Sequence, residues 1–257
     1  MTTPLLELKN VVVTVNAGTP EELNIMDHLN LTINQGDFIT VLGTNGAGKS
    51  TLFNVIGGDL PITSGQILLN GKDISHLSVE KRTRFLSRVF QDPKMGTAPR
   101  MTVAENLLLA QKRGQRRTLL PRKLKQQIPS FEELTATMPN DLHERLNTPT
   151  GKLSGGQRQA LSFLMATVKR PDILLLDEHT AALDPKTSTD LMRITNQRIN
   201  EENLTCLMIT HHLTDALQSG NRLIVLSHGQ IVFDVNGQAK QDLTQEQLYD
   251  YFSDLAD

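Results

Sequence analysis

Short apolar runs of strand length alternate along this chain with stretches whose apolar residues recur at helical spacing. Such alternation is typical of an α/β fold with a largely parallel central sheet. The predicted strands are 6–15, 29–33, 37–42, 66–69, 88–90, 173–176, 205–209 and 222–226. The first two are predicted to lie near a sheet edge, and Asn70-Gly71 is predicted to follow one arm of a hairpin.

Between about residues 92 and 169 the patterns become mainly helical, and strand patterns return beyond them. One of these helices is predicted to begin at Thr102, because Thr102 and Glu105 have the spacing of a capping box. The core is therefore predicted to be split into 1–91, which includes an antiparallel part at the sheet edge, and 170–235. A helical subdomain, 92–169, is inserted between these halves, and 236–257 form a helical appendage whose last helix spans 244–252.

Composition disfavours several classes of protein for this 257-residue chain. A net charge of −2 gives no electrostatic reason to expect a nucleic-acid partner, and 4% aromatic residues are few for a base-stacking platform. No apolar run reaches the roughly 18 residues that cross a bilayer, and the first residues do not resemble a signal peptide. We therefore expect a soluble, cytoplasmic protein whose membrane role comes through a partner. The single Cys206 lies in an apolar strand and is predicted to be a buried thiol.

A glycine-rich turn between a predicted strand and a predicted helix carries the clearest chemistry. Its residues match the P-loop pattern: Gly43, Thr44, Asn45, Gly46, Ala47, Gly48, Lys49, Ser50 and Thr51. Glycines allow positive φ and turn N–H groups toward phosphate oxygens, and the following helix directs its positive end at the same anion. Lys49 is expected to reach the β- and γ-phosphates, and the Ser50 hydroxyl is a hard ligand for Mg²⁺. The segment predicts nucleotide binding, with a merely tight turn as the alternative.

The predicted strand 173–176 ends in two carboxylates, Asp177 and Glu178. Asp177 is placed to hold Mg²⁺ or its water, as in P-loop NTPases generally. Glu178 is the candidate general base, polarising the water that attacks the γ-phosphate. The alternative interpretation is an acidic strand end at the surface.

A second anion site is predicted where Leu153-Ser-Gly-Gly-Gln157 opens a helix. Ser154 begins this helix, and two glycines in its first turn expose N–H groups at its positive end. Two phosphate-binding helix starts beside one P-loop suggest either two different nucleotides or a site shared between chains. A plain N-cap serine followed by small residues is the alternative.

Together these motifs resemble the ATPase subunits of the ABC transporter family, whose signature is the Leu-Ser-Gly-Gly-Gln string. The resemblance runs from about residue 6 to 234, and the motifs come in the family's order: P-loop, Gln91, signature, Asp177-Glu178, Ala182-Leu183-Asp184 and His211. It implies a P-loop NTPase core, ATP hydrolysis, and the cofactors ATP and Mg²⁺. In that family two copies pack head to tail, so that Ser154 and Gly156 of one reach the γ-phosphate held by Lys49 of the other.

The same resemblance assigns roles to three further residues. Gln91 would touch Mg²⁺ or the attacking water and link the site to the helical subdomain. Asp184 would lie at the dimer seam, although it also suits an ordinary helix N-cap before Pro185. His211, preferred over its neighbour His212, would hold the γ-phosphate and keep the water aligned with the base. The metal-side residues would then be Ser50, Gln91 and Asp177, and the catalytic residues Gln91, Glu178 and His211.

For the whole protein, the resemblance implies an ATP-driven subunit at the cytoplasmic face of the membrane, attached to a separate integral membrane permease. The Gln91-Asp-Pro segment, the basic stretch 112–125 and the string 177–184 are similar to importers that pair with a substrate-binding protein, for amino acids or related small solutes. An ABC exporter, or a soluble ABC ATPase acting on DNA or ribosomes, is the alternative. The basic stretch itself is predicted to be solvated, with contact to lipid headgroups or the permease as the other interpretation.

Two positions depart from the family's pattern. The segment 11–22 lacks the aromatic residue that usually stacks on adenine, and Val15 or a neighbour takes its place. Because an aliphatic contact lacks the stacking area of a ring, we expect weaker discrimination between bases. His179 replaces the usual proline after Glu178, and either fills the turn or contacts the dimer seam.

Overall fold

The chain forms two compact units. The computed structural model describes residues 4–115 and 123–254. The first unit combines Met1–Arg82 with Thr205–Asp257, and the second unit is Thr83–Leu204. Both units mix strands with helices, which confirms the predicted α/β class. The finer division into 1–91, 92–169, 170–235 and 236–257 stays a prediction.

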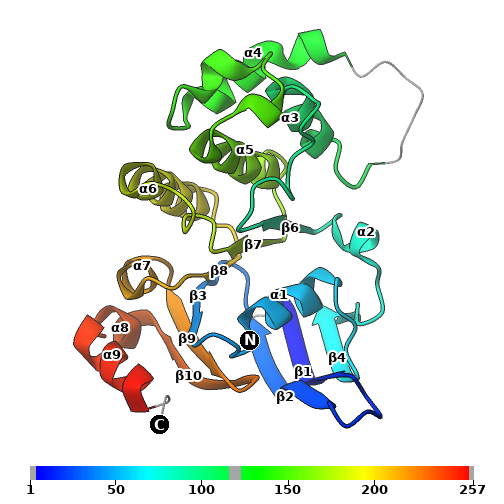
Figure 1. Ribbon diagram of the computed structural model, residues 1–257, viewed down its shortest axis with the longest axis vertical. Coiled ribbons are helices and arrows are strands. Elements are labelled where there is room, and N and C mark those ends of the chain that lie inside the picture. The colour runs from blue at the N-terminus through cyan, green and yellow to red at the C-terminus, as the bar shows by residue number, and fades with distance from the viewer. Residues whose placement is uncertain (1–3, 116–122, 255–257) are drawn as a thin grey trace. The chain divides into compact units, whose positions relative to one another are not determined.

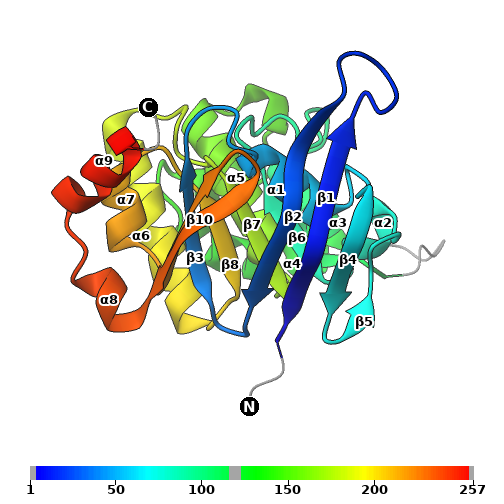
Figure 2. The same cartoon turned by 90° about the horizontal axis from the view of Figure 1, so that it is seen from below.

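One sheet of the first unit is antiparallel, with the strand order β2–β1–β4–β5. Its strands are β1 (Leu6–Val15), β2 (Leu23–Ile33), β4 (Ser64–Leu69) and β5 (Lys72–Asp73), and Figure 2 shows β1 between β2 and β4. Asn70 and Gly71 join β4 to β5 with φ values of 48° and 74°, the positive angles of a two-residue hairpin turn. The predicted hairpin is therefore confirmed, and the predicted strand 29–33 is part of a longer one.

The other sheet of the first unit carries the most buried strands. β3 (Phe38–Gly43) runs parallel to both β8 (Cys206–Ile209) and β9 (Arg222–Ser227), and β10 (Gln230–Asn236) pairs antiparallel with β9. The first five residues of β3 are buried without alternation, as in a strand covered on both faces. Cys206 is buried as predicted, and burial raises the pKa of its thiol. The sequence prediction missed β10, a half-buried strand whose residues alternate between exposed and partly covered.

Helices pack on these sheets. Those described in the first unit are α1 (Lys49–Gly57), α2 (Val79–Arg82), α7 (Leu213–Gln218), α8 (Gly237–Gln241) and α9 (Gln245–Asp254). Helix α9 confirms the predicted last helix, and α8 was not predicted. Ala216 of α7, Leu223 of β9 and Leu248 of α9 belong to one buried apolar cluster, which holds the C-terminal helix on the sheet.

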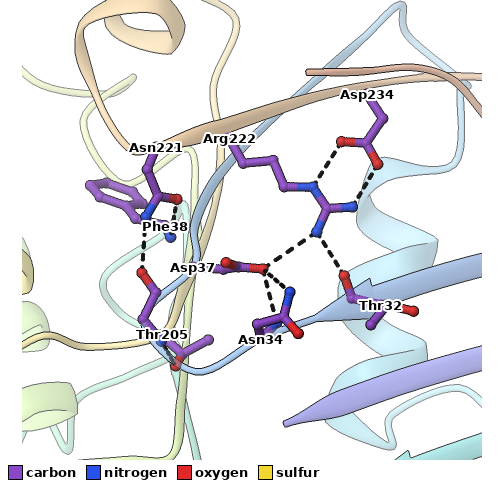
Figure 3. Close-up of polar contacts among 9 residues, drawn as sticks. Thr32, Asn34, Asp37, Phe38, Thr205, Asn221, Arg222 and Asp234 are labelled. Carbon is purple, nitrogen blue, oxygen red and sulfur yellow. Dashed lines mark hydrogen bonds and ion pairs between the residues drawn. The ribbon is translucent and has the colours of Figure 1, made fainter. Parts of the chain in front are cut away.

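Arg222 joins the two sheets of the first unit (Figure 3). Its guanidinium makes a bidentate ion pair with Asp234 on β10, at 2.8 and 2.5 Å. Its Nη1 also donates to the carbonyl oxygen of Thr32 on β2, at 2.7 Å, and to Asp37 just before β3, at 3.4 Å. The hydrogen bond to Asp234 raises the pKa of Arg222. This cluster therefore fixes the antiparallel sheet next to the strand that leads into the P-loop.

The second unit combines a parallel pair of strands with four helices among its described residues. β6 (Leu86–Val89) pairs with β7 (Ile173–Asp177), and Figure 1 shows α3, α4 and α5 grouped in this unit. The helices are α3 (Val103–Gln111), α4 (Leu124–Ala136), α5 (Gly155–Thr167) and α6 (Pro185–Glu201), with 3₁₀ turns at Leu142–Arg145 and Thr150–Lys152. Thr102 and Glu105 form the predicted capping box of α3. Over the described residues, no helix is both long and apolar enough to cross a bilayer.

The basic stretch 112–125 contains a structural arginine. Arg116, Arg117 and Arg122 lie outside the described residues. The Arg113 guanidinium, by contrast, donates to the carbonyl oxygens of Ala166 and Lys169 at the C-terminal end of α5, and to the Ser87 hydroxyl. The predicted solvated role is therefore wrong at this position. A cation at a helix C-terminus satisfies the last carbonyls and complements the helix dipole.

Candidate functional site

The P-loop lies in the first unit, between the carboxyl end of β3 and the start of α1. Gly48 is the N-cap of α1, with φ 101°, and it makes no side-chain hydrogen bond to the helix. The first turn of α1 holds no acidic residue, and the loop residues 44–46 are exposed. A nine-residue helix whose positive end is uncapped beside an open loop is suited to bind a phosphate group.

Two glycines of the loop are required for different reasons. A Cβ at Gly43 would lie 2.5 Å from the carbonyl oxygen of Leu226, so the close passage of β9 requires glycine there. A Cβ at Gly46 would meet nothing within 4 Å, and there the left-handed φ of 83° favours glycine. Gly43 therefore serves the packing of the sheet, and Gly46 serves the shape of the loop.

Lys49 places a positive charge over this loop. Its side chain is 6% exposed, and Nζ donates to the carbonyl oxygens of Gly43 at 2.7 Å and of Thr44 at 3.0 Å. Ser50 follows in the first turn of α1 and is exposed, so its hydroxyl is open to a ligand. These positions fit an anion in the loop with a cation beside it.

Arg82 anchors the opposite end of α1. Its Nη1 donates to the last carbonyl oxygens of the helix, those of Val55 and Ile56, both at 2.8 Å. Its Nη2 donates to Ile74 and Ser75, and burial lowers the pKa of this arginine. The helix that begins at the P-loop is therefore held at its far end by a buried cation.

His211 lies at the same edge of the first-unit sheet as the P-loop. It follows the carboxyl end of β8, the parallel neighbour of β3, with Ile209 opposite Val41. Ligands of open α/β sheets bind at this edge. Both His211 and His212 are exposed, and His212 is the N-cap of α7 without a side-chain bond to the helix, so the preference for His211 stays a prediction.

In the second unit, the carboxyl ends of β6 and β7 bring four polar side chains together. Nη2 of Arg88 lies 2.6 Å from Oδ2 of Asp177, and Nε2 of Gln91 donates to Oε2 of Glu178 at 3.1 Å. Both pairs arise because β6 and β7 run side by side in the same direction. Gln91 and Glu178, predicted from separate motifs, are thus adjacent. Sequence reasoning missed Arg88, whose only signal was a cation inside a short apolar strand.

Glu178 has an unusual backbone conformation. Its φ is 45°, in the left-handed region, which costs about 1–3 kcal/mol for a residue other than glycine. The next side chain, His179, turns inward and stacks on Phe163 of α5, with Nε2 3.2 Å from the Thr195 hydroxyl on α6. Burial lowers the pKa of His179 to about 4. Of the two interpretations of His179, the structure supports the one in which it fills the turn.

Ser154 is the N-cap of α5. Its hydroxyl accepts the N–H of Gln157, and its own N–H donates to the side chain of Gln157, both at 3.2 Å. This capping box confirms the N-cap alternative, and a hydroxyl that accepts one hydrogen bond keeps its hydrogen to donate elsewhere. A Cβ at Gly155 would meet nothing within 4 Å, but at Gly156 it would lie 2.7 Å from Cγ2 of Thr187. Packing against α6 therefore already requires glycine at 156.

Asp184 caps α6 in the same manner. Its carboxylate accepts the N–H of Thr187 at 3.1 Å, with Pro185 in the first position of the helix. Hydrogen bonding from Thr187 lowers the pKa of Asp184. The N-cap alternative is confirmed, and a place at a dimer seam stays a prediction.

The predicted site residues therefore form two sets, one in each unit. The first unit holds the P-loop, Gly43 to Thr51, together with His211. The second unit holds Gln91, Ser154, Gly156, Asp177, Glu178 and Asp184. Within the second set, the Gln159 side chain of α5 donates to the Phe90 carbonyl oxygen at 3.1 Å, which links the helix that begins at Ser154 to the segment before Gln91.

Known proteins are similar to this chain in sequence. The family model described as ABC transporter matches residues 26–181, more than half of the chain. The tyrosine transport ATP-binding protein of Clostridioides difficile (strain R20291) is 44% identical over 248 residues, which cover 96% of this chain and 98% of that protein. The spermidine/putrescine import ATP-binding protein PotA of Haemophilus ducreyi is 33% identical over 96% of this chain, which spans 60% of PotA.

A solved structure shows the same architecture. The dimeric post-hydrolysis state of the ATP-binding cassette MJ0796, bound to ADP and Pi, has a TM-score of 0.75 and 27% identity, over 90% of this chain and 98% of that one. The residues that the family model matches include the P-loop and Asp177-Glu178. The chain therefore belongs to the ABC transporter family, and it is an ATP-binding, ATP-hydrolysing subunit.

Proposed function

We propose that this subunit powers the uptake of a small solute, such as an amino acid, through a separate membrane permease. The observation that carries the proposal is the 44% identity, over nearly the full length of both chains, to a tyrosine transport ATP-binding protein. The similarity to PotA, an import protein, supports the direction. The subunit would then lie at the cytoplasmic face of the membrane, bound to the permease, with a substrate-binding protein as the third component.

The P-loop is the proposed site for the phosphates of ATP. Lys49 and the uncapped start of α1 supply the positive charge and the N–H donors. The hydroxyl of Ser50, the carboxylate of Asp177 and the amide oxygen of Gln91 are hard donors, which fit Mg²⁺. Mg²⁺ held by these residues would supply positive charge that offsets the negative charge of the phosphates.

Glu178 is the proposed general base of hydrolysis. The amide of Gln91 donates to its carboxylate at 3.1 Å and so orients the group that would accept the proton. His211, at the P-loop edge of the first unit, is proposed to hold the γ-phosphate and keep the attacking water in line with the base. The roles of these residues follow the family resemblance, and the hydrogen bond between Gln91 and Glu178 supports them.

Two copies are proposed to close head to tail on ATP. Ser154 and Gly156 of one copy would reach the γ-phosphate held by Lys49 of the other, with Asp184 at the seam. The dimeric cassette bound to ADP and Pi supports this arrangement. Closure around the shared nucleotide would do the mechanical work, and hydrolysis with phosphate release would reopen the pair.

The oligomeric state of a slow variant tests the closed pair. Glu178→Gln with saturating MgATP is expected to sediment as a dimer, and without nucleotide as a monomer. Glu201→Gln, an exposed glutamate at the end of α6, is the matched control and should show no trapped dimer. A strictly monomeric Glu178→Gln protein, both alone and with its permease, would contradict the proposal.

The solute is tested in the assembled transporter. With the permease and the substrate-binding protein in liposomes, tyrosine is expected to stimulate ATP hydrolysis. It is also expected to accumulate on the side of the membrane where the ATPase lies, opposite to the substrate-binding protein. Spermidine serves as the control solute, because a relative of lower identity is named for spermidine/putrescine import. Stimulation by spermidine alone would leave the ATPase role intact and overturn the amino-acid assignment.

A further inference from the structure

Arg88 gives Asp177 a fixed counter-ion inside the second unit. Nη2 of the arginine lies 2.6 Å from Oδ2 of the aspartate, and the two side chains are only 11% and 14% exposed. A charge-assisted hydrogen bond that is largely withdrawn from water is stronger than an exposed surface pair. Part of the negative charge of Asp177 is therefore already neutralised by the chain itself.

The surroundings of Arg88 keep it in place. In the parallel register Arg88 lies opposite Leu175, and Leu175 and Asp177 are two residues apart on β7. Residues two apart on a strand share a face, so the arginine and the aspartate project on the same side of the pair. Cζ of Arg88 also lies 4.9 Å from the centre of the Phe90 ring, which stabilises the cation where it is.

We propose that Arg88 competes with Mg²⁺ for Asp177 and so sets how strongly nucleotide binding depends on Mg²⁺. This inference rests on the proposed function, in which Asp177 holds the metal or its water. Two cations beside one carboxylate repel each other, so the divalent ion binds only by sharing or loosening the existing ion pair. Arg88 acts through Asp177 and is a positioning residue, without contact to the reacting atoms.

The opposite sign follows from a purely orienting role. If Arg88 only held the Asp177 carboxylate in the right rotamer, its removal would weaken metal binding. If Arg88 competes with the metal, its removal strengthens metal binding. The direction of a single measured change therefore separates the two roles.

The measurement is the effect of Mg²⁺ on nucleotide affinity, without turnover. A fluorescent ATP analogue is titrated with the Glu178→Gln protein in excess Mg²⁺ and in chelator. The dissociation constant in chelator divided by that in Mg²⁺ gives the coupling between metal and nucleotide. Arg88→Gln in this background is expected to raise that ratio about tenfold. Arg198→Gln is the control, because Arg198 of α6 makes its ion pair with Glu202, the C-cap of that helix, at 3.1 Å. Direct binding of Mn²⁺, followed by its electron spin resonance, gives a second readout.

Further variants keep each outcome informative. Asp177→Asn should remove most of the coupling, and an unchanged coupling in that variant would defeat the proposed role of Asp177 itself. If Asp177→Asn removes the coupling but Arg88→Gln leaves it equal or lowers it, the inference about Arg88 is wrong while the proposed function stands. Arg88→Lys keeps the positive charge but loses the planar guanidinium, so it should raise the coupling ratio less than Arg88→Gln does. If the Arg88→Gln protein does not fold, Arg88→Lys takes its place in the test.

Discussion

The P-loop of the first unit and the acidic strand end of the second unit are built from different parts of the chain. The P-loop is mainly a backbone structure, in which glycines take positive φ and the ammonium of Lys49 bonds to main-chain carbonyls. The strand end is a side-chain structure, in which Arg88 and Gln91 reach Asp177 and Glu178 from a neighbouring strand. The first depends on a single contiguous segment, and the second depends on residues nearly ninety positions apart.

This difference predicts how each region responds to change. A substitution in the P-loop acts through backbone conformation and close packing, so it should alter folding and nucleotide binding together. A substitution at the strand end changes charge or hydrogen bonding in a frame that the sheet already holds, so it should alter chemistry while binding persists. The predictions below separate these two kinds of effect.

The largest expected effect is on turnover in Glu178→Gln. Loss of a general base should slow ATP hydrolysis by about 10²–10⁴-fold. ATP affinity should stay within about twofold, because the P-loop donors do not depend on the carboxylate. Phosphate release and equilibrium binding measure the two quantities, with Glu201→Gln as the control. Normal turnover would remove Glu178 from the mechanism, and lost binding would show that the two regions are not separable.

The next effect concerns His179, whose pKa burial lowers from 6.5 to about 4. Between these values the unfolded chain binds a proton that the folded chain does not, so stability is full above pH 6.5 and falls as the pH drops toward 4. The loss should reach about 2 kcal/mol between pH 7 and 5. Urea unfolding at pH 7 and at pH 5 should show a smaller loss of unfolding free energy in His179→Gln than in the original protein. His143→Gln, a variant at an exposed histidine, should keep the full loss. An equal loss in the original protein and in both variants would contradict a buried, neutral His179.

A smaller effect distinguishes two glycines of the P-loop. Gly43→Ala should destabilise the protein by about 2 kcal/mol, because the added Cβ would lie 2.5 Å from a carbonyl oxygen of β9 and force the strands apart. Gly46→Ala should cost about 1 kcal/mol, from left-handed strain alone. Chemical denaturation of both variants measures the difference. A larger cost at position 46 would mean that loop strain, rather than strand packing, dominates.

The same contrast explains what could be predicted from the sequence. The P-loop was readable because its signals are local: glycine positions, an apolar strand before and a helix after. Arg88 and Arg113 were not readable as an ion-pair partner and a helix cap, because both roles depend on which distant segment packs beside them. Strand β10 was missed because none of its residues is fully buried, so it lacks the apolar run of a core strand.

Three of the predicted site residues also have a structural role. Glycine at 156 was predicted from an approach to phosphate, yet the Thr187 side chain of α6 already excludes a Cβ there. Ser154 was expected to reach the γ-phosphate in the other copy and Asp184 to lie at the dimer seam, and both are helix caps within the second unit, as their alternatives stated. A loss of stability on substitution at these three positions therefore does not reveal a role in the site, and nucleotide binding has to be measured beside it.

The smallest expected effect concerns Val15, at the end of β1. It pairs with Leu23 on β2, and two residues further along β2 the carbonyl oxygen of Ile25 lies 3.4 Å from a Cβ built at Gly48. The strand pair that carries Val15 therefore passes beside the start of α1, where an aromatic ring could stack on a base. Val15→Tyr should tighten ATP binding by about 2- to 10-fold, the range of added aromatic stacking.

Affinities for ATP and GTP in both proteins complete this test. The original chain should discriminate weakly between the two nucleotides, because an aliphatic side chain contacts either base over a small area. Leu23→Tyr, at a 60% exposed position on the facing strand, is the control for a general gain in aromatic surface. An equal gain from Leu23→Tyr would place the base elsewhere along the strand pair. A strong preference for ATP in the original chain would show that hydrogen bonds, rather than stacking, select the base, and that the missing ring had been replaced by polar contacts.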